Sequence, residues 1–193
     1  IMIFDSGSSW MTLLVLCLMV LASSWISLNT LVTQQQEPGF KKRLFPAALV
    51  AILLGGGVIL LLVTQVVLQL QPWYLPRYVI PLAGMIFATS MTSISLAAER
   101  LQSEMWQGKS YQEARAVAFR TALIPIINSM FAVGLVSLPG MMTGQILSGV
   151  SPFIAARYQI MVMCMLFSAS GITAALFLVL IKKHLGQITH RGR

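Results

Sequence analysis

Charged residues are scarce in this chain: Asp, Glu, Lys and Arg make up only 9% of its 193 residues, whereas hydrophobic residues make up 57%. An ordinary soluble domain carries roughly a quarter of its residues charged, so this class of protein is excluded. The composition indicates an integral membrane protein. The net charge of +8 would suggest nucleic-acid binding in a soluble protein. In a membrane protein the position of the cations matters more, and we expect no nucleic-acid partner.

The side chains that most often carry catalysis or bind metals are also few. The two histidines, His184 and His190, lie in a basic tail, and the two cysteines, Cys17 and Cys164, lie in apolar runs that suggest neither a disulfide nor a zinc site. The sequence shows no paired carboxylates in an apolar run, no Ser-His-Asp arrangement and no phosphate-binding Gly-x-x-x-x-Gly-Lys-Ser/Thr motif. We therefore expect no enzymatic activity and no cofactor, and the sequence assigns no metal ligand.

Long hydrophobic runs are what the sequence has in abundance. A helix needs about 20 apolar residues to cross a bilayer. Five runs approach or exceed this length, at about residues 10–32, 45–70, 79–98, 122–150 and 158–181. The sequence therefore predicts an all-α fold, a polytopic transmembrane helical bundle in a single domain of residues 1–193. Because the chain begins with Ile1 rather than Met, we expect it to be N-terminally incomplete.

The cations are distributed unevenly between the two ends of these runs. If all five runs span the membrane, Arg77 and Arg157 fall on one side, and eleven cations fall on the other: Lys41, Lys42, Arg43, Arg100, Lys109, Arg115, Arg120, Lys182, Lys183, Arg191 and Arg193. Cytoplasmic loops carry the excess of Lys and Arg. We therefore expect a multi-pass protein of the inner (plasma) membrane, with the 99–120 loop and the C-terminus in the cytoplasm.

The fourth run contains residues that disrupt helices. It reads Gly134-Leu-Val-Ser-Leu-Pro-Gly-Met-Met-Thr-Gly-Gln145, and proline removes a backbone donor and clashes with the preceding turn, so we expect a kink or break near Leu138-Pro139-Gly140. Two interpretations stay open. The segment is either a Pro-kinked packing helix whose Gly140 and Gly144 allow close helix contact, or a discontinuous helix that lines a transport path.

This run also resembles the hallmark of a known family, the FetB-type ABC transporter permeases. The same family pattern is matched by residues 146–152 (Ile-Leu-Ser-Gly-Val-Ser-Pro), 158–161 (Tyr-Gln-Ile-Met), 80–85 (Ile-Pro-Leu-Ala-Gly-Met) and 122–125 (Ala-Leu-Ile-Pro). Members of the family are implicated in bacterial iron export, and plant relatives are linked to aluminium tolerance. The resemblance implies a membrane permease subunit, working as a homodimer with a separate cytoplasmic ATP-binding subunit, and two further spans ahead of Ile1.

The resemblance and the polar residues of the fourth run together suggest where substrate passes. The expected path residues are Asn128, Ser137, Pro139, Gly140, Met141, Met142, Thr143, Gly144 and Gln145. A path of soft methionine ligands is conceivable. Methionine in membrane helices more commonly serves packing, so no metal ligand is assigned.

The hydrophilic 99–120 segment is the expected coupling loop, because permeases of this kind place a coupling helix in a cytoplasmic loop. On a helical wheel, Tyr111, Ala114 and Ala118 share a small apolar face, Arg115 lies at its edge and Arg120 lies opposite. We expect the apolar face to dock on the ATPase and the two arginines to add charged contacts. The alternative is a helix that lies on the membrane surface with its cations towards anionic lipid.

A different class of function is also possible, a self-sufficient secondary carrier or channel for a metal ion or small solute. Carriers usually have an ionisable residue at membrane depth, and none of the predicted spans contains an acidic residue. The sequence therefore favours the ABC permease, and the resemblance implies that its substrate is a metal ion such as iron.

Overall fold

A computed structural model of the chain describes residues 9–29, 40–72, 74–136 and 138–189. These residues form the helices α2 (Ser9–Asn29), α3 (Phe40–Ala51), α4 (Gly57–Leu62), α5 (Pro76–Trp106), α6 (Tyr111–Ala132), α7 (Gly140–Leu147) and α8 (Pro152–Thr189). Two π-helical segments, η1 (Ile52–Gly56) and η2 (Val63–Val67), flank α4 and continue α3 into one long element. The described residues contain no strand, which confirms the all-α helical bundle.

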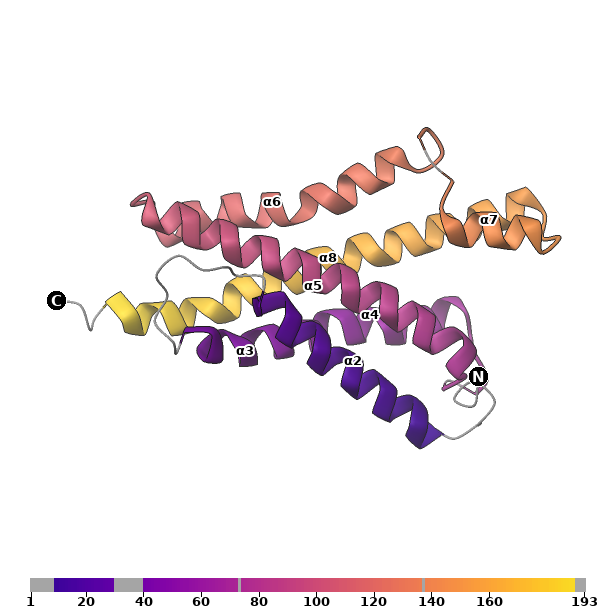
Figure 1. Cartoon of the computed structure of the whole chain (residues 1–193), viewed down its shortest axis with the longest axis horizontal. Coiled ribbons are helices and arrows are strands. Elements are labelled where there is room, and N and C mark those ends of the chain that lie inside the picture. The colour runs from indigo at the N-terminus through magenta and orange to yellow at the C-terminus, as the bar shows by residue number, and fades with distance from the viewer. Residues whose placement is uncertain (1–8, 30–39, 73, 137, 190–193) are drawn as a thin grey trace.

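The long helices lie side by side and alternate in direction along the bundle (Figure 1). Four segments are long and apolar enough to cross a membrane, namely Ser9–Leu28, Leu44–Val67, Pro76–Trp106 and Pro152–Lys182. They correspond to the first, second, third and fifth runs expected from the sequence.

The fourth expected run is the exception, and the prediction of five spans is not confirmed there. Its first part lies in α6, and α6 runs beside α5 along the bundle (Figure 1). The opening ten residues of α6 carry Glu113, Arg115 and Arg120, and α6 is not among the described segments that are long and apolar enough to cross a membrane. Only the C-terminal half of α6 is apolar enough for a membrane interior.

The glycines of the second run allow close helix contacts. A methyl group added to Gly55 would meet the Thr173 Oγ1 atom of α8 at 2.6 Å and the Thr173 Cα at 3.0 Å. A methyl group on Gly56 would meet Ile86 and Phe87 of α5 at 3.1–3.2 Å. Without a hydrophobic force between helices in lipid, such close backbone packing is a main source of helix association. Gly55 and Gly56 therefore let this element pack closely on α8 and α5.

The expected 99–120 loop is not a loop. Helix α5 continues to Trp106, and α6 begins at Tyr111, so the connection is a tight turn of residues 107–110. Gly108 has a φ of +82°, which favours glycine. The side chains of Ser110 and Glu113 form a reciprocal capping box that starts α6, with the Glu113 N–H donating to the Ser110 hydroxyl at 3.4 Å and the Ser110 N–H donating to the Glu113 carboxylate at 3.0 Å.

The break in the fourth run begins earlier than the sequence predicted. Helix α6 ends at Ala132, and Val133 and Gly134 leave the helical conformation, Gly134 with a φ of +84°. Pro139 is not a kink within a helix: it precedes the first residue of α7, and its carbonyl accepts the Thr143 N–H at 3.0 Å. The left-handed residue Gly134 therefore terminates the helix, and Pro139, with a φ of −60°, starts the next one.

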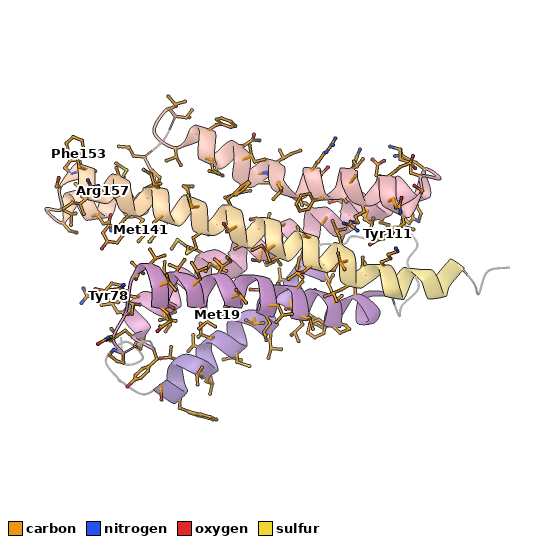
Figure 2. The ribbon with its side chains drawn as sticks, turned by 180° about the vertical axis from the view of Figure 1, so that it is seen from behind. Met19, Tyr78, Tyr111, Met141, Phe153 and Arg157 are labelled. Atoms are coloured by element: carbon orange, nitrogen blue, oxygen red, sulfur yellow. The ribbon has the colours of Figure 1, made fainter. Side chains whose placement is uncertain are left out.

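The helical bundle has two ends, and they carry different residues. Tyr111 lies at one end, and Tyr78, Met141, Phe153 and Arg157 lie at the other (Figure 2). The Tyr111 hydroxyl donates to the carbonyl of Leu178, which places the start of α6 beside the late part of α8. We call the first the turn end, after residues 107–110, and the second the α7 end, after residues 139–147.

Candidate functional site

The residues expected to line the path lie at the α7 end, on the surface of the chain. No residue of α7 is buried, Met141 is 42% exposed, and Asn128 is exposed on α6. Pro139 directly precedes α7, residues 140–145 lie within α7, and Asn128 lies on α6. Ser137 lies outside the described residues. These side chains therefore form an exposed end of the bundle and not an interior channel within this single chain.

Two polar side chains of α7 have contrasting environments. The Thr143 hydroxyl donates to the Pro139 carbonyl at 3.1 Å, which satisfies it locally. The Gln145 Oε1 atom is buried and has no hydrogen-bond partner among the described residues. A buried unpaired carbonyl oxygen costs roughly 1–3 kcal/mol of desolvation free energy. Among the described residues of α7, Gln145 thus has a side-chain oxygen that still needs a hydrogen-bond donor.

The packing interpretation of Gly140 and Gly144 is not met within this chain. A methyl group on either glycine would meet no described atom within 4 Å. This contrasts with Gly55 and Gly56, which are held between helices. The close contact that small residues permit is therefore available at α7 but unused.

Inside the bundle, polar oxygen atoms meet between α5 and α8. The hydroxyls of Ser90 and Thr173 lie 3.2 Å apart, both residues are fully buried, and Gly55 packs on Thr173. In the sequence, Ser90 and Thr173 are each marked only as a polar residue in an apolar run. This pair can exchange a hydrogen bond but has no ionisable group, so it supplies no acid–base chemistry.

At the turn end, the face expected to dock on a partner is covered by the chain itself. Ala114 and Ala118 are fully buried where α6 packs against α5 and α8. Tyr111 is tied to Leu178, and its burial raises the pKa of the phenol. The expectation that this face is free for an ATPase is therefore wrong. Helical periodicity identified the apolar face correctly, but α5 and α8 of the same chain cover this face.

An ion-pair network that the sequence analysis missed fixes the turn. The carboxylate of Glu104, which is fully buried, binds the Arg100 guanidinium at 2.5 Å and the Lys109 ammonium group. Glu104 thus joins the last turns of α5 to Lys109 in the turn that precedes α6. The spacing of Arg100 and Glu104, four residues apart on a helix, was the available signal.

The exposed part of the turn end is basic and carries a large aromatic residue. Trp106 is 66% exposed at the end of α5, and Arg115 and Arg120 are exposed on α6. Beside them, α6 and α8 border a groove with a volume of about 440 Å³, lined by Gln112, Arg115, Ala116, Phe119, Ala175 and Leu178. Trp106 was not singled out from the sequence, because nothing there distinguishes an exposed tryptophan from an interfacial anchor.

The described residues contain no group of three or more His, Cys, Asp or Glu side chains that could hold a metal ion. Of the methionines, Met165 is buried in the hydrophobic core, as expected for packing. His184 lies in the part of α8 whose side chains are outside the described set, and His190 lies outside the described residues altogether.

Comparison with known proteins identifies the family. Residues 1–185 match the family described as "Uncharacterised protein family (UPF0014)". The chain belongs to this family. A UPF0014 membrane protein of Synechocystis is 34% identical over 202 aligned residues, covering 94% of this chain and 76% of the relative.

Two further relatives have informative names. The Escherichia coli protein "Probable iron export permease protein FetB" is 31% identical, covering 89% of this chain and 68% of its own length. The Arabidopsis "Protein ALUMINUM SENSITIVE 3" is 33% identical, covering 52% of this chain and 42% of its own length. These matches confirm the resemblance that the sequence pattern indicated. No solved structure matches the chain.

Proposed function

We propose that this UPF0014 chain is the membrane permease subunit of an ABC transporter that exports iron or a related metal ion. The observation that carries the proposal is the 31% identity to a named iron export permease over 89% of the chain. The helical bundle with four apolar segments of membrane-spanning length is compatible with such a subunit. The sequence has no nucleotide-binding motif, so a separate cytoplasmic ATPase supplies the energy.

In this proposal the turn end faces the cytoplasm. Nine of the eleven cations counted on that side lie in the described helices and the turn, at Lys41, Lys42, Arg43, Arg100, Lys109, Arg115, Arg120, Lys182 and Lys183. Arg157 lies at the opposite end (Figure 2), and Arg77 directly precedes Tyr78, which lies there too. The excess of Lys and Arg on one side sets the orientation of membrane proteins.

We propose that the ATPase binds the tip of the α5–α6 hairpin and not the Ala114–Ala118 face, which is buried. Trp106 presents a large exposed ring there, and exposed aromatic residues with neighbouring cations are typical centres of protein interfaces. Arg115 and Arg120 supply the charged rim. Since the Glu104 ion pairs and the Tyr111 hydrogen bond to Leu178 tie the turn to α5, α6 and α8, a push on the turn would move these helices together.

The α7 end is the proposed exit of the substrate path. Its support is the helix break between Ala132 and Gly140 and the buried, unpartnered oxygen of Gln145. Non-helical backbone at membrane depth is tolerated where protein or a watered cavity covers it. In this chain α7 packs on α8 and is otherwise partly exposed, and we propose that a second copy of the permease subunit completes the path as a homodimer.

The first experiment asks whether an ATPase binds the turn. The tagged chain is purified in mild detergent from its own membranes, and co-purifying proteins with a phosphate-binding loop are identified by mass spectrometry. We expect such an ATPase with the wild type and a loss of at least tenfold with Trp106→Ala, since central aromatic residues contribute about 2 kcal/mol or more to an interface. Trp10→Ala is the matched control, because Trp10 is 74% exposed at the start of α2.

The outcomes separate the proposal from its rival. An ATPase retained equally by Trp106→Ala and Trp10→Ala would remove the turn as the coupling contact. A chain that binds no ATPase but still moves metal ions would be a secondary carrier or channel.

A further inference from the structure

The groove between α6 and α8 has a chemical polarity along its length. On α6 it is lined by Gln112, Arg115, Ala116 and Phe119, which recur at intervals of three and four residues and so form one stripe of the helix. On α8 it is lined by Ala175 and Leu178. Lys182 follows Leu178 by one helical turn and is exposed. The groove is therefore cationic at its turn end and apolar further along.

The depth of the groove matches the edge of a membrane. In the sequence, the apolar run of α8 ends at Ile181 and is followed by Lys182 and Lys183. With a rise of about 1.5 Å per residue, Leu178 lies about 6 Å and Ala175 about 10 Å from Lys182 along the helix axis. On α8 the groove thus begins at the level of lipid head groups and continues into the level of acyl chains, and on α6 its apolar residues Ala116 and Phe119 lie in the amphipathic first half of the helix. Its volume of about 440 Å³ is that of a small-molecule site.

The cations at the mouth of the groove have no salt-bridge partner within the described part of the chain. The carboxylate of Glu104 is engaged by Arg100 and Lys109, and that of Glu113 is engaged by the Ser110 cap. Arg115 and Lys182 are exposed and take part in neither salt bridge. An anionic group at the mouth would complement both charges.

We propose that the α6–α8 groove binds one anionic phospholipid. The phosphate lies at Arg115, Gln112 and Lys182, and one acyl chain lies along Ala116, Phe119 and Ala175. Basic pockets between membrane helices on the cytoplasmic side are suited to anionic head groups. An acyl chain carries no hydrogen-bonding group into the apolar part, whereas a protein segment would bring backbone N–H and C=O groups that nothing there satisfies. The chemistry of the groove therefore favours a lipid over an acidic peptide.

The test is a lipid titration of the purified chain in neutral detergent, followed by native mass spectrometry. The two probes are phosphatidylglycerol and phosphatidylcholine with identical acyl chains. We expect one tightly bound phosphatidylglycerol and weak, unsaturated binding of phosphatidylcholine. Arg115→Gln should weaken phosphatidylglycerol binding about fivefold, the contribution of one cation near a membrane surface. Arg120→Gln makes the same charge change on a different side of α6 and should leave the affinity within twofold.

A second variant tests the apolar part of the groove. Ala175→Leu keeps every charge and places a larger side chain where the acyl chain would lie, and Ala175 is exposed, so the larger side chain meets no buried neighbour. It should weaken phosphatidylglycerol binding severalfold while circular dichroism stays unchanged. Equal losses in Arg115→Gln and Arg120→Gln would show diffuse surface charge and overturn the site, and so would an unchanged affinity in Ala175→Leu.

Two competitors identify other occupants. Glycerol 3-phosphate that displaces the lipid at equal concentration would show that the groove recognises the phosphate alone. A Glu-rich peptide that displaces it would assign the groove to an acidic protein segment. Either result overturns the proposal. The titration contains no ATPase and no transported metal, so its outcome does not depend on the proposed transport function.

Discussion

The contact of Gly55 with α8 gives the sharpest test of how the bundle is held together. In Gly55→Ala the new methyl group would lie 2.6 Å from the Thr173 Oγ1 atom, 3.0 Å from its Cα and 3.1 Å from its N. Two of these three atoms are backbone, so relief requires α8 to shift. Adding a methyl group to a packed interior typically costs about 1–3 kcal/mol.

Gly57→Ala is the matched control, because a methyl group on Gly57 meets no described atom within 4 Å. Both substitutions gain helix propensity of up to about 1 kcal/mol, so the difference between them isolates the clash. We therefore expect Gly55→Ala to be less stable than Gly57→Ala by about 1–3 kcal/mol. Unfolding in mixed micelles of increasing denaturing-detergent fraction, followed by circular dichroism, measures the free energy of unfolding of both variants.

The Thr173→Ala background refines the same test. It removes the atom at 2.6 Å but leaves the two backbone contacts, so the cost of Gly55→Ala should fall by part of its value and not vanish. A double-mutant cycle reports this coupling directly. Equal stability of Gly55→Ala and Gly57→Ala in the wild-type background would refute the close approach of the two helices.

Three further predictions concern the ends of the bundle. In a variant without native cysteines, Lys109→Cys should resist an impermeant thiol reagent in intact cells while Arg157→Cys reacts; the reverse pattern would invert the proposed orientation. Pro139→Ala should leave the break in place, with unchanged amide exchange over residues 133–139, and lowered exchange there would contradict this. Gly134→Ala should destabilise the chain by about 1–2 kcal/mol, because Gly134 has a φ of +84°. Ser110→Ala should lose about 1 kcal/mol and speed amide exchange in the first turn of α6; unchanged exchange would argue against the capping box.

The capping box also implies a pH dependence. Hydrogen bonds from the Ser110 side chain and backbone lower the pKa of Glu113 below its ordinary value of 4.5. A carboxyl group whose pKa is lowered by folding adds stability above its unfolded pKa and loses it as the pH falls through the folded pKa. The start of α6 should therefore loosen only below about pH 4.5, and less so in Ser110→Ala. Amide exchange of residues 111–114 in the wild type and the variant would measure it, and identical acid profiles would contradict the role of the box.

Hydropathy was sufficient to predict four of the long helices, because the length of an apolar run is set by the thickness of the bilayer. It was not sufficient for α6, whose polar half and apolar half belong to one continuous helix. The capping box that starts this helix at Ser110 could be found in the sequence, since Ser110 and Glu113 have the required spacing. The density of charged residues instead merged the polar half of α6 with the end of α5 into one expected loop of residues 99–120.

The candidate site shows where a single sequence stops being informative. The apolar face of Ala114 and Ala118 was predictable from helical periodicity. Periodicity gives no information on what covers a face, and here α5 and α8 of the same chain cover it. In the same way, Pro139 and Gly140 signalled a break, but the place where α6 ends depends on the backbone conformation of Gly134.

Transport itself is the most direct test of the proposed function. The chain and the ATPase that co-purifies with it are reconstituted in liposomes that enclose an iron(II)-sensitive fluorophore. ATP is added outside the liposomes, so that only complexes whose ATPase faces outward are energised. The proposal predicts iron accumulation that requires ATP and is lost with Trp106→Ala but kept with Trp10→Ala. Iron flux of equal rate without ATP or without the ATPase would contradict the account, because it would make the chain a carrier or channel.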